Sequence, residues 1–304
     1  MKIENKLEIV IITYNRSQLL DNTLAQFLVS PFKDCKITIL NNCSTDNTIS
    51  VCEKYLNKFS DISLSTNRIN IGADANILRA VEIVSLDYLW IVCDDDDYDF
   101  SYCDDIIDSI ANDKVDIINI GAHLEDEWKY GGQLKSVKEF VNAGYPFFKA
   151  ASFVPNNIFR VKKFLPYIIA GYKNVTNMYP HMPYLLSNYF LDNLLYISKN
   201  RIVTAGIGAQ NYNSKDWVQG WLNTSNLLKN KDDIKQCFYQ QWSTGFLNEI
   251  RICFGFFFTA IKGRLFLKTV YGAFLLLSVL QKILFVLLFI PYSIFRIIQK
   301  IMIR

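Results

Sequence analysis

Four consecutive carboxylates at residues 94–97 follow directly on an apolar run, Tyr88–Cys93. Carboxylates this close together repel one another strongly unless a cation neutralises part of their charge. Hard divalent cations prefer such oxygen ligands, and phosphate groups of a substrate often complete their coordination. The chain has no GxGxxG or GxxxxGK[ST] loop that would hold phosphate in another way. The run therefore predicts a divalent metal site, although a solvated acidic loop would have the same composition.

The elements expected around this run place it at one edge of a sheet. Strands are expected over the apolar segments 7–13, 36–40, 61–65 and 88–93, with a helix between each pair. This alternation is typical of βαβ units, so we expect an α/β fold with a mostly parallel, doubly wound sheet. Ligands bind beyond the carboxyl ends of the strands in such sheets. The polar loops that follow the strands should therefore meet beside the carboxylates.

Four short motifs occur in order over residues 7–97. They are Val-Ile-Ile-Thr-Tyr-Asn-Arg at 10–16, Leu-Asn-Asn-Cys-Ser-Thr-Asp-Asn-Thr at 40–48, the spaced residues Asn67, Asn70, Gly72 and Asn76, and the carboxylates 94–97. Together they resemble the opening of family 2 glycosyltransferases with the GT-A fold, in which the last motif is the DxD metal motif. The resemblance implies a Rossmann-like sheet, a nucleotide-sugar donor, a divalent cation (Mn²⁺ or Mg²⁺) and an inverting transfer to an acceptor hydroxyl.

The resemblance also implies roles for individual side chains around the donor. It places these residues in the donor pocket: Thr13, Tyr14, Arg16, Asn42, Asp46, Asn76 and Asp94. Asn42 would stand near the base, and Asp46 would anchor its loop. Asp96 would be the direct metal ligand, with Asp94 nearer the ribose or the waters of the metal. The family often has Asp where this chain has Asn41, and ordinary turn chemistry is the alternative interpretation for Asn41 and Asn42.

An inverting transfer needs a general base near the acceptor hydroxyl, and two residues are candidates. Residues 153–160 resemble the strand that floors the acceptor site in related enzymes, which commonly carry a Glu-Asp pair after it. No such pair occurs between residues 160 and 215, but His181 lies at the expected place. An imidazole titrates in the physiological range, so His181 is the first candidate and Asp192 the second, with the acidic group at 125–127 behind them. The alternative for His181 is a structural histidine bonded to the backbone.

The charge of the chain is divided unevenly along its length. The formal net charge is +3, but residues 251–304 contain eight basic residues and no acidic one, which leaves −5 for residues 1–250. The near-neutral total argues against a nucleic-acid partner. The seven cysteines form no CxxC pair, and the start of the chain has no apolar signal segment. We therefore expect reduced thiols and a cytoplasmic body.

The basic segment is also strongly apolar, which predicts contact with a membrane surface. Residues 270–290 are long enough to span a bilayer, but Gln281, Lys282 and Pro291 interrupt the run. On one continuous helix, six basic residues would share a narrow stripe: Arg264, Lys268, Lys282, Arg296, Lys300 and Arg304. We therefore expect a helix, kinked at Pro291, that lies in the membrane interface beside anionic headgroups, with a single span as the alternative.

These observations predict three regions: a nucleotide-sugar-binding half at residues 1–110, an acceptor-binding half at 111–230, and a helical membrane-associating tail at 231–304. Residues 215–217 are expected in a surface loop, with a lid over the donor as the alternative. The predicted function is a metal-dependent inverting glycosyltransferase at the cytoplasmic face of the cell membrane, acting on a lipid-linked or glycan acceptor in surface-polysaccharide synthesis. The alternatives are a phosphatase of the haloacid dehalogenase type, which also carries Asp-x-Asp after an apolar strand, and a catalytically inactive membrane-bound scaffold.

Overall fold

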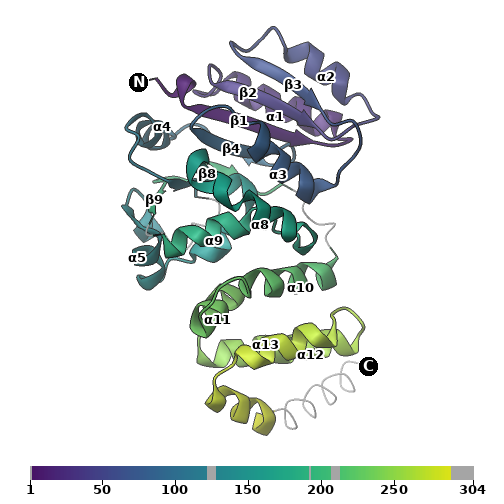
Figure 1. Cartoon of the computed structure of the whole chain (residues 1–304), viewed down its shortest axis with the longest axis vertical. Helices are drawn as coiled ribbons and strands as arrows, with labels where there is room; N and C mark the ends of the chain where they lie inside the picture. The colour runs from purple at the N-terminus through teal and green to yellow at the C-terminus, as the bar shows by residue number, and fades with distance from the viewer. Residues whose placement is uncertain (1, 122–127, 192, 207–212, 289–304) are drawn as a thin grey trace. The chain divides into compact units, whose positions relative to one another are not determined.

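The computed structural model describes residues 2–121, 128–191, 193–206 and 213–288, and it divides into two compact units. The first unit, Met1–Asn211, is an α/β body, and the second, Tyr212–Arg304, is helical (Figure 1). Every strand of the described residues belongs to the body. The body therefore contains the sheet edge at which the sequence places the carboxylate run.

The first half of the body forms four parallel strands. They are β1 (Leu7–Thr13), β2 (Lys36–Asn41), β3 (Ile62–Thr66) and β4 (Tyr88–Cys93), and they pair in the order β3-β2-β1-β4. The predicted strands and their parallel arrangement are confirmed. β1 and β4 are buried along almost their whole length, which explains their continuous apolar runs. Thr13, Asn41 and Cys93 end three neighbouring strands at the same edge of the sheet.

Helices connect these strands and cover them. They are α1 (Ser17–Leu28), α2 (Thr48–Tyr55), α3 (Ala73–Ile83) and, after the carboxylate run, α4 (Asp104–Ala111). α1 packs against α2, and α3 packs on β1 and β4. The fully buried ring of Trp90 in β4 lies edge-on to Phe27 of α1 and to Phe32, with ring centroids 5.6 and 5.5 Å apart. This aromatic packing ties α1 to the strand that ends in the carboxylates.

The second half of the body extends the same sheet with strands of both directions. These strands are β6 (Ile117–Asn119), β7 (Leu134–Ser136), β8 (Asn157–Arg160) and β9 (Leu194–Ile197), and the full order is β3-β2-β1-β4-β8-β6-β9-β7. β8 runs antiparallel to both of its neighbours, and β7 runs antiparallel to β9. The sheet is therefore mixed, with most of its pairs parallel. Because β8 is antiparallel to β4, the amino end of β8 lies at the edge where β4 ends.

Short helices accompany this second half: α5 (Val137–Asn142), α6 (Phe147–Ser152), α7 (Val161–Phe164), α8 (Ile168–Lys173) and α9 (Met182–Phe190). The strand predicted over residues 153–160 is shorter than expected, because Val154–Asn156 forms a 3₁₀ turn before β8. The buried amide of Asn156 donates to Ala150 C=O, and that of Asn157 donates to Ala151 C=O, at 3.0 Å each. These bonds fix the carboxyl end of α6 against the amino end of β8.

In its described residues, 213–288, the second unit contains helices and no strand. They are α10 (Ser214–Ser225), α11 (Lys231–Gln240), α12 (Phe246–Ile261), α13 (Leu267–Leu276) and a further helical stretch at residues 279–288. α10 packs against α11 and α13, so the helical unit begins near residue 212 and not at the predicted residue 231. Residues 215–217 lie in α10, and the surface loop predicted for them is wrong. Asn213 starts this helix, because its side chain accepts a hydrogen bond from Lys215 N–H at 3.0 Å.

The single continuous helix predicted for the basic segment is wrong, because the chain turns twice within it. Gly263 adopts a φ of 70° after α12, and Arg264 N–H returns to Thr259 C=O at 3.0 Å in a Schellman motif. The second turn follows α13, and Ser278 precedes the stretch 279–288. The basic residues of 264–282 therefore do not lie on one helix, and the predicted kink at Pro291 lies outside the described residues. None of the described helices is long and apolar enough to cross a membrane.

Gln281 closes the second turn. It is 1% exposed, and its Nε2 donates to Phe246 C=O at 2.8 Å and to Glu249 Oε2 at 2.6 Å. Its Oε1 accepts from Lys235 Nζ at 3.0 Å and from Ser278 N–H at 2.9 Å. A polar residue that interrupts the apolar run in the sequence thus joins α11, α12 and the last helical stretch.

We expect Gln281→Ala to lower the free energy of unfolding by about 1–2 kcal/mol, because it removes the four hydrogen bonds of a buried side chain, while Lys235 and Glu249 keep their ion pair. Urea denaturation followed by the helical signal measures this change. Gln18→Ala, at an exposed position of α1, is the matched control and should change stability by less than about 0.5 kcal/mol. Equal stability of the two variants would contradict the polar contacts of Gln281.

Candidate active site

The structure brings the carboxylate run beside the loop that follows β1. Arg16 Nη1 donates to Asp94 Oδ1 at 3.2 Å and to Asp95 Oδ2 at 2.7 Å. Thr13 is buried at the end of β1, whereas the ring of Tyr14 is 41% exposed at the mouth of the loop. Two residues predicted to line the donor pocket, Thr13 and Arg16, therefore lie beside the first carboxylate, and the guanidinium offsets part of its charge.

The segment after a second, small sheet holds Asp96 from another direction. β10 (Val203–Thr204) pairs antiparallel with β5 (Asp97–Tyr98), and Gly206 N–H then donates to Asp96 Oδ1 at 3.0 Å. A Cβ at residue 206 would overlap the carbonyl oxygen of Asp95, so only glycine fits there. The sequence analysis missed Gly206, because the contact joins residues 110 positions apart and no local pattern indicates it.

Four buried polar atoms at this edge have no hydrogen-bond partner among the described residues: Thr13 Oγ1, Asn41 Nδ2, Asp94 Oδ2 and Asp96 Oδ2. Buried polar atoms are nearly always paired, so unpaired ones gathered at one edge indicate a place for a ligand. Burial raises the pKa of Asp94 to about 6 and the pKa of Asp96 to about 7. A cation bound here would stabilise the ionised carboxylates.

The donor atoms around Asp96 fit a divalent cation. The sulfur of Cys93 and one carboxylate oxygen each of Asp95 and Asp96 lie within 4.8 Å of one another. Asp94 is turned toward Arg16 and is not part of this group. The geometry agrees with Asp96 as direct ligand and with Asp94 nearer the ribose or the metal waters, which stay predictions. Asp95, to which the sequence analysis gave no role, lies beside Asp96.

Asp46, in the loop between β2 and α2, binds the amino ends of two helices. Its Oδ2 accepts from Ser17 N–H of α1, and its Oδ1 accepts from Thr48 N–H of α2, at 3.0 Å each. A carboxylate is favoured at helix amino ends, where unpaired N–H groups concentrate. Asn15, which has a φ of 51°, holds the same loop because its Oδ1 accepts from Thr45 N–H at 2.7 Å. These contacts are those of a loop anchor, the role predicted for Asp46.

Asn42 uses its amide inside the protein. Its Oδ1 accepts from Asn67 Nδ2 at 2.9 Å and from Ile71 N–H at 3.0 Å, and its Nδ2 donates to Asn70 Oδ1 at 2.9 Å. Asn67 Nδ2 also donates to Asn76 Oδ1 at 2.8 Å. Asn42 and Asn76 therefore position the loop 67–72 through a shared amide network. These bonds join residues 25–29 positions apart, so they are not the local turn bonds considered as the alternative, and the place of Asn42 near the base stays a prediction.

His181 lies directly before α9 and is 2% exposed. Its Nε2 is 3.2 Å from Ala151 O and 3.1 Å from Ser152 O, and its Nδ1 has no partner among the described residues. Carbonyl oxygens only accept, so we assign the hydrogen to Nε2 and the lone pair to Nδ1. Burial lowers the pKa of His181 to about 4, which keeps the ring neutral at physiological pH. The carbonyls that hold the ring immediately precede the turn into β8, whose amino end lies at the carboxylate edge.

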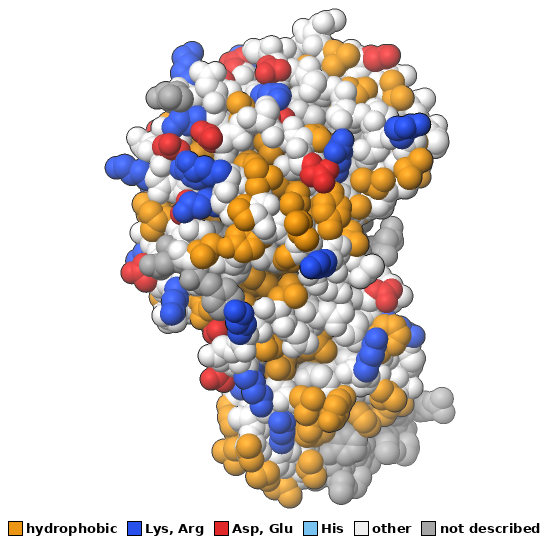
Figure 2. Space-filling view, viewed as in Figure 1, with side chains coloured by type: hydrophobic (Ala, Val, Ile, Leu, Met, Phe, Trp, Pro, Cys, Tyr) orange, Lys and Arg blue, Asp and Glu red, His pale blue; other side chains and the backbone are white. Residues whose placement is uncertain are grey.

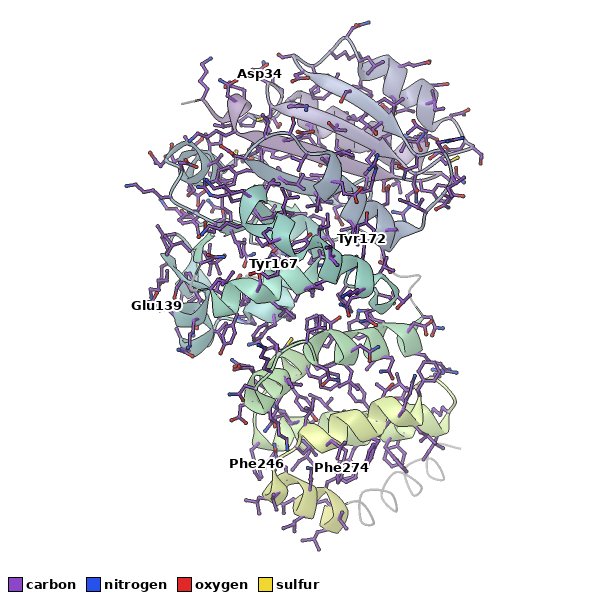
Figure 3. The ribbon with its side chains drawn as sticks, in the orientation of Figure 1. Asp34, Glu139, Tyr167, Tyr172, Phe246 and Phe274 are labelled. Carbon is purple, nitrogen blue, oxygen red and sulfur yellow. The ribbon has the colours of Figure 1, made fainter. Side chains whose placement is uncertain are left out.

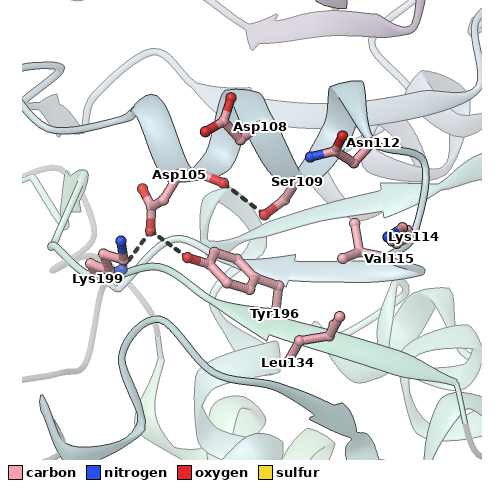
Figure 4. Close-up of a pocket in the computed structure, with 9 residues that line it drawn as sticks. All are labelled: Asp105, Asp108, Ser109, Asn112, Lys114, Val115, Leu134, Tyr196 and Lys199. Carbon is pink, nitrogen blue, oxygen red and sulfur yellow. Dashed lines mark hydrogen bonds between the residues drawn. The ribbon is translucent and has the colours of Figure 1, made fainter.

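The other candidates for the base cannot be placed. Asp192 and the acidic group at 125–127 lie outside the described residues. A shallow pocket beside α4 and β9 contains none of the predicted site residues, and Figure 4 shows Asp105 bonded there to Tyr196 Oη at 2.9 Å and to Lys199 N–H at 2.7 Å. The candidate site is therefore the carboxyl edge of β1, β2 and β4.

The fold is an α/β sheet of mixed direction with two buried carboxylates, Asp94 and Asp96, at the carboxyl edge of β4. The family described as Glycosyl transferase family 2 matches residues 8–170, which is more than half of the chain. The chain belongs to this family, and the prediction from the four motifs is confirmed.

Individual relatives resemble parts of the chain. The abequosyltransferase RfbV of Salmonella typhimurium (strain LT2) is 34% identical over 87 residues, which are 28% of this chain and 26% of that protein. TarS of S. aureus has a TM-score of 0.59 at 15% identity and covers 81% of this chain and 45% of its own. The mannosyltransferase PcManGT of Pyrobaculum calidifontis has a TM-score of 0.53 at 12% identity and covers 88% and 74%. This chain thus spans about a quarter of the curated relative and under half of the TarS chain, and the solved structures support the fold alone.

We expect His181→Gln to make the stability of the protein less sensitive to acid. The folded protein keeps His181 neutral down to a pKa of about 4, whereas the unfolded chain takes up a proton near pH 6.5. Stability is therefore lost as the pH falls from about 6.5 to about 4, and the loss amounts to about 3 kcal/mol. Glutamine keeps an N–H for the two carbonyls and does not titrate. Urea denaturation across this range checks the difference, and parallel curves for the two proteins would rule out a buried neutral histidine.

Proposed function

We propose that the protein is a metal-dependent, inverting glycosyltransferase that moves a sugar from a nucleoside diphosphate to an acceptor hydroxyl. The observation that carries this proposal is the pair of buried carboxylate oxygens without a partner among the described residues, Asp94 Oδ2 and Asp96 Oδ2, with Arg16 bonded to Asp94. A nucleotide sugar presents ribose hydroxyls, which donate hydrogen bonds, and a diphosphate, which requires positive charge. This edge offers carboxylate acceptors for the hydroxyls and both a cation site and a guanidinium for the diphosphate.

The relatives support a donor of this class. TarS residues 1–349 have been solved with UDP-GlcNAc and with UDP, and PcManGT has been solved with GDP-Man and Mn²⁺. The fold of this chain resembles theirs, with TM-scores between 0.53 and 0.57. We extend a nucleotide-sugar donor and Mn²⁺ or Mg²⁺ to this chain on that basis.

Inversion follows from a single displacement at the anomeric carbon. The acceptor oxygen forms the new glycosidic bond as it gives up its proton, and the bond to the diphosphate breaks with its electron pair on the phosphate oxygen. His181 Nδ1 is the first candidate for this proton, although its buried ring is bonded to backbone carbonyls and burial lowers its pKa to about 4, as in a structural histidine. Asp192 is the alternative base. Asp96 would hold a Mn²⁺ or Mg²⁺ ion, with Asp94 nearer the ribose or the metal waters, and such an ion would supply positive charge for the leaving diphosphate.

The acceptor and the location complete the proposal. We propose a lipid-linked or glycan acceptor in cell-surface polysaccharide synthesis, at the cytoplasmic face of the cell membrane. The support is the composition of residues 251–304, which are apolar and carry eight basic residues and no acidic one. An acceptor carried by a lipid would be presented at the same surface.

We expect Asp96→Asn to remove metal-dependent transfer, with turnover reduced at least about 100-fold, because the metal ligand loses its charge. Asp97→Asn, the neighbouring exposed carboxylate, removes the same charge and should keep turnover within about 3-fold of wild type. Circular dichroism confirms that both variants are folded. Undiminished turnover in Asp96→Asn would refute the metal assignment.

We also expect one of UDP, GDP, CDP and dTDP to raise the melting temperature in the presence of Mn²⁺. A ligand at 100 times its Kd stabilises the native state by about 2.7 kcal/mol, so the preferred base stands out. Omission of Mn²⁺ and the Asp96→Asn variant are the controls. Absence of any shift would support the inactive scaffold, and hydrolysis of simple phosphate esters without a nucleotide would support the phosphatase.

A further inference from the structure

The helical unit presents an apolar and basic surface along α13. We define the α13 face by six residues: Arg264, Phe266, Leu267, Lys268, Tyr271 and Leu275. Leu267 is 68% exposed, Tyr271 is 63% exposed and Leu275 is 43% exposed. These three residues recur every fourth position, so they lie on the same side of the helix. Figure 2 shows hydrophobic side chains gathered over this unit with Lys and Arg among them.

Other side chains of α13 account for its packing in the unit. Ala273 is fully buried, and Thr269 Oγ1 donates to Gln219 Oε1 of α10 at 2.6 Å. The ring of Phe274, labelled in Figure 3, lies 5.2 Å from that of Phe285 in the last helical stretch. α13 therefore packs in the unit through these residues, and the exposed residues of the α13 face are not part of the core of the unit.

The charged members of the α13 face, Arg264 and Lys268, are both basic, while on the neighbouring α10 Lys215 is followed by the exposed Asp216. Lys268 Nζ lies 5.3 Å from the centre of the Phe266 ring, and Lys215 Nζ lies 5.6 Å from it. Lys262 and Arg264 are exposed in the turn between α12 and α13. Residues 251–304 include no acidic residue that would neutralise them. The α13 face is thus matched to a partner that is negatively charged at its surface and apolar beneath.

The same character continues beyond α13. In the stretch 279–288 the exposed side chains are apolar: Val279, Leu280, Ile283, Val286, Leu287 and Leu288. Phe285 of this stretch is turned inward and stacks on Phe254 of α12 at 4.4 Å. Soluble surfaces rarely carry so many adjacent apolar side chains unless they bind something.

We propose that the α13 face docks on an anionic phospholipid bilayer, with α13 lying in the membrane interface. Exposed apolar side chains gain by leaving water, and the adjoining basic groups gain by approaching anionic headgroups. The ten residues of α13 are about 15 Å long, half of the roughly 30 Å hydrocarbon core, so this helix lies on the membrane and does not span it. A second copy of the chain is a poorer occupant, because pairing would oppose the basic groups of both copies.

This inference identifies the surface that would bind the membrane named in the proposed function. It rests on the proposed function only for the membrane location. The residues of the α13 face make no contribution to the proposed donor site. Lipid binding and nucleotide binding are therefore separate measurements, and the failure of one leaves the other standing.

The test is flotation of the full chain with vesicles of phosphatidylcholine alone and of phosphatidylcholine mixed with phosphatidylglycerol. We expect binding to the anionic vesicles and much weaker binding to the neutral ones. The double variant Arg264→Gln/Lys268→Gln should weaken anionic binding by about 25-fold, about 5-fold for each charge lost. Leu267→Ser/Leu275→Ser should weaken it through the loss of apolar burial. Nucleotide-induced thermal shifts should stay unchanged in both.

Matched control variants in the body distinguish binding through the α13 face from nonspecific binding to vesicles. Lys138→Gln removes an exposed charge of α5, and Val29→Ser removes a side chain that is 85% exposed. Neither control should alter vesicle binding. Equal binding of wild type and the double variants, or a concentration-dependent dimer that the α13-face variants abolish, would overturn the proposal. Circular dichroism confirms that each variant is folded.

Discussion

Two carboxylates held almost out of water at the end of β4 are the constraint around which the body is arranged. Ionised groups in such a place are costly unless opposite charge and hydrogen bonds compensate them. Arg16 supplies charge to Asp94, and the Gly206 N–H supplies a hydrogen bond to Asp96. Thr23 of α1 donates to the backbone carbonyl of Asp94 at 3.0 Å. Each contact comes from a different part of the chain, so the site depends on the fold as a whole.

The antiparallel direction of β8 brings the segment that is bonded to His181 toward the edge where β4 ends. Because β8 runs against β4, the turn before β8 lies at the carboxylate edge, although its residues follow about sixty positions later. The Asn157 amide and the His181 ring meet at the same carbonyl, Ala151 O. An imidazole held in this way keeps one tautomer, and because burial lowers its pKa to about 4 it stays neutral at physiological pH, as a structural histidine does.

The helical unit shows how polar residues change meaning between sequence and structure. Gln281 and Lys282 interrupt an apolar run, and a helical wheel places Lys282 on a stripe with Arg264. In the structure Gln281 is buried among polar partners, and Gly263 and Ser278 separate the helices that the wheel had joined. The segment still presents apolar and basic side chains at its surface, because they lie on the outer sides of short helices.

The sequence by itself determined the parallel strands, the loops after them and the family, because strand periodicity and turn residues act over a few positions. The resemblance to the family also implied Asp46 as a loop anchor, and its contacts with the starts of α1 and α2 agree with that role. Only the tertiary structure decided that Asn42 and Asn76 bind the loop 67–72, that Gly206 approaches Asp96, and that the basic segment folds into separate helices. These outcomes depend on contacts between residues far apart in the chain, whose energies no local pattern contains.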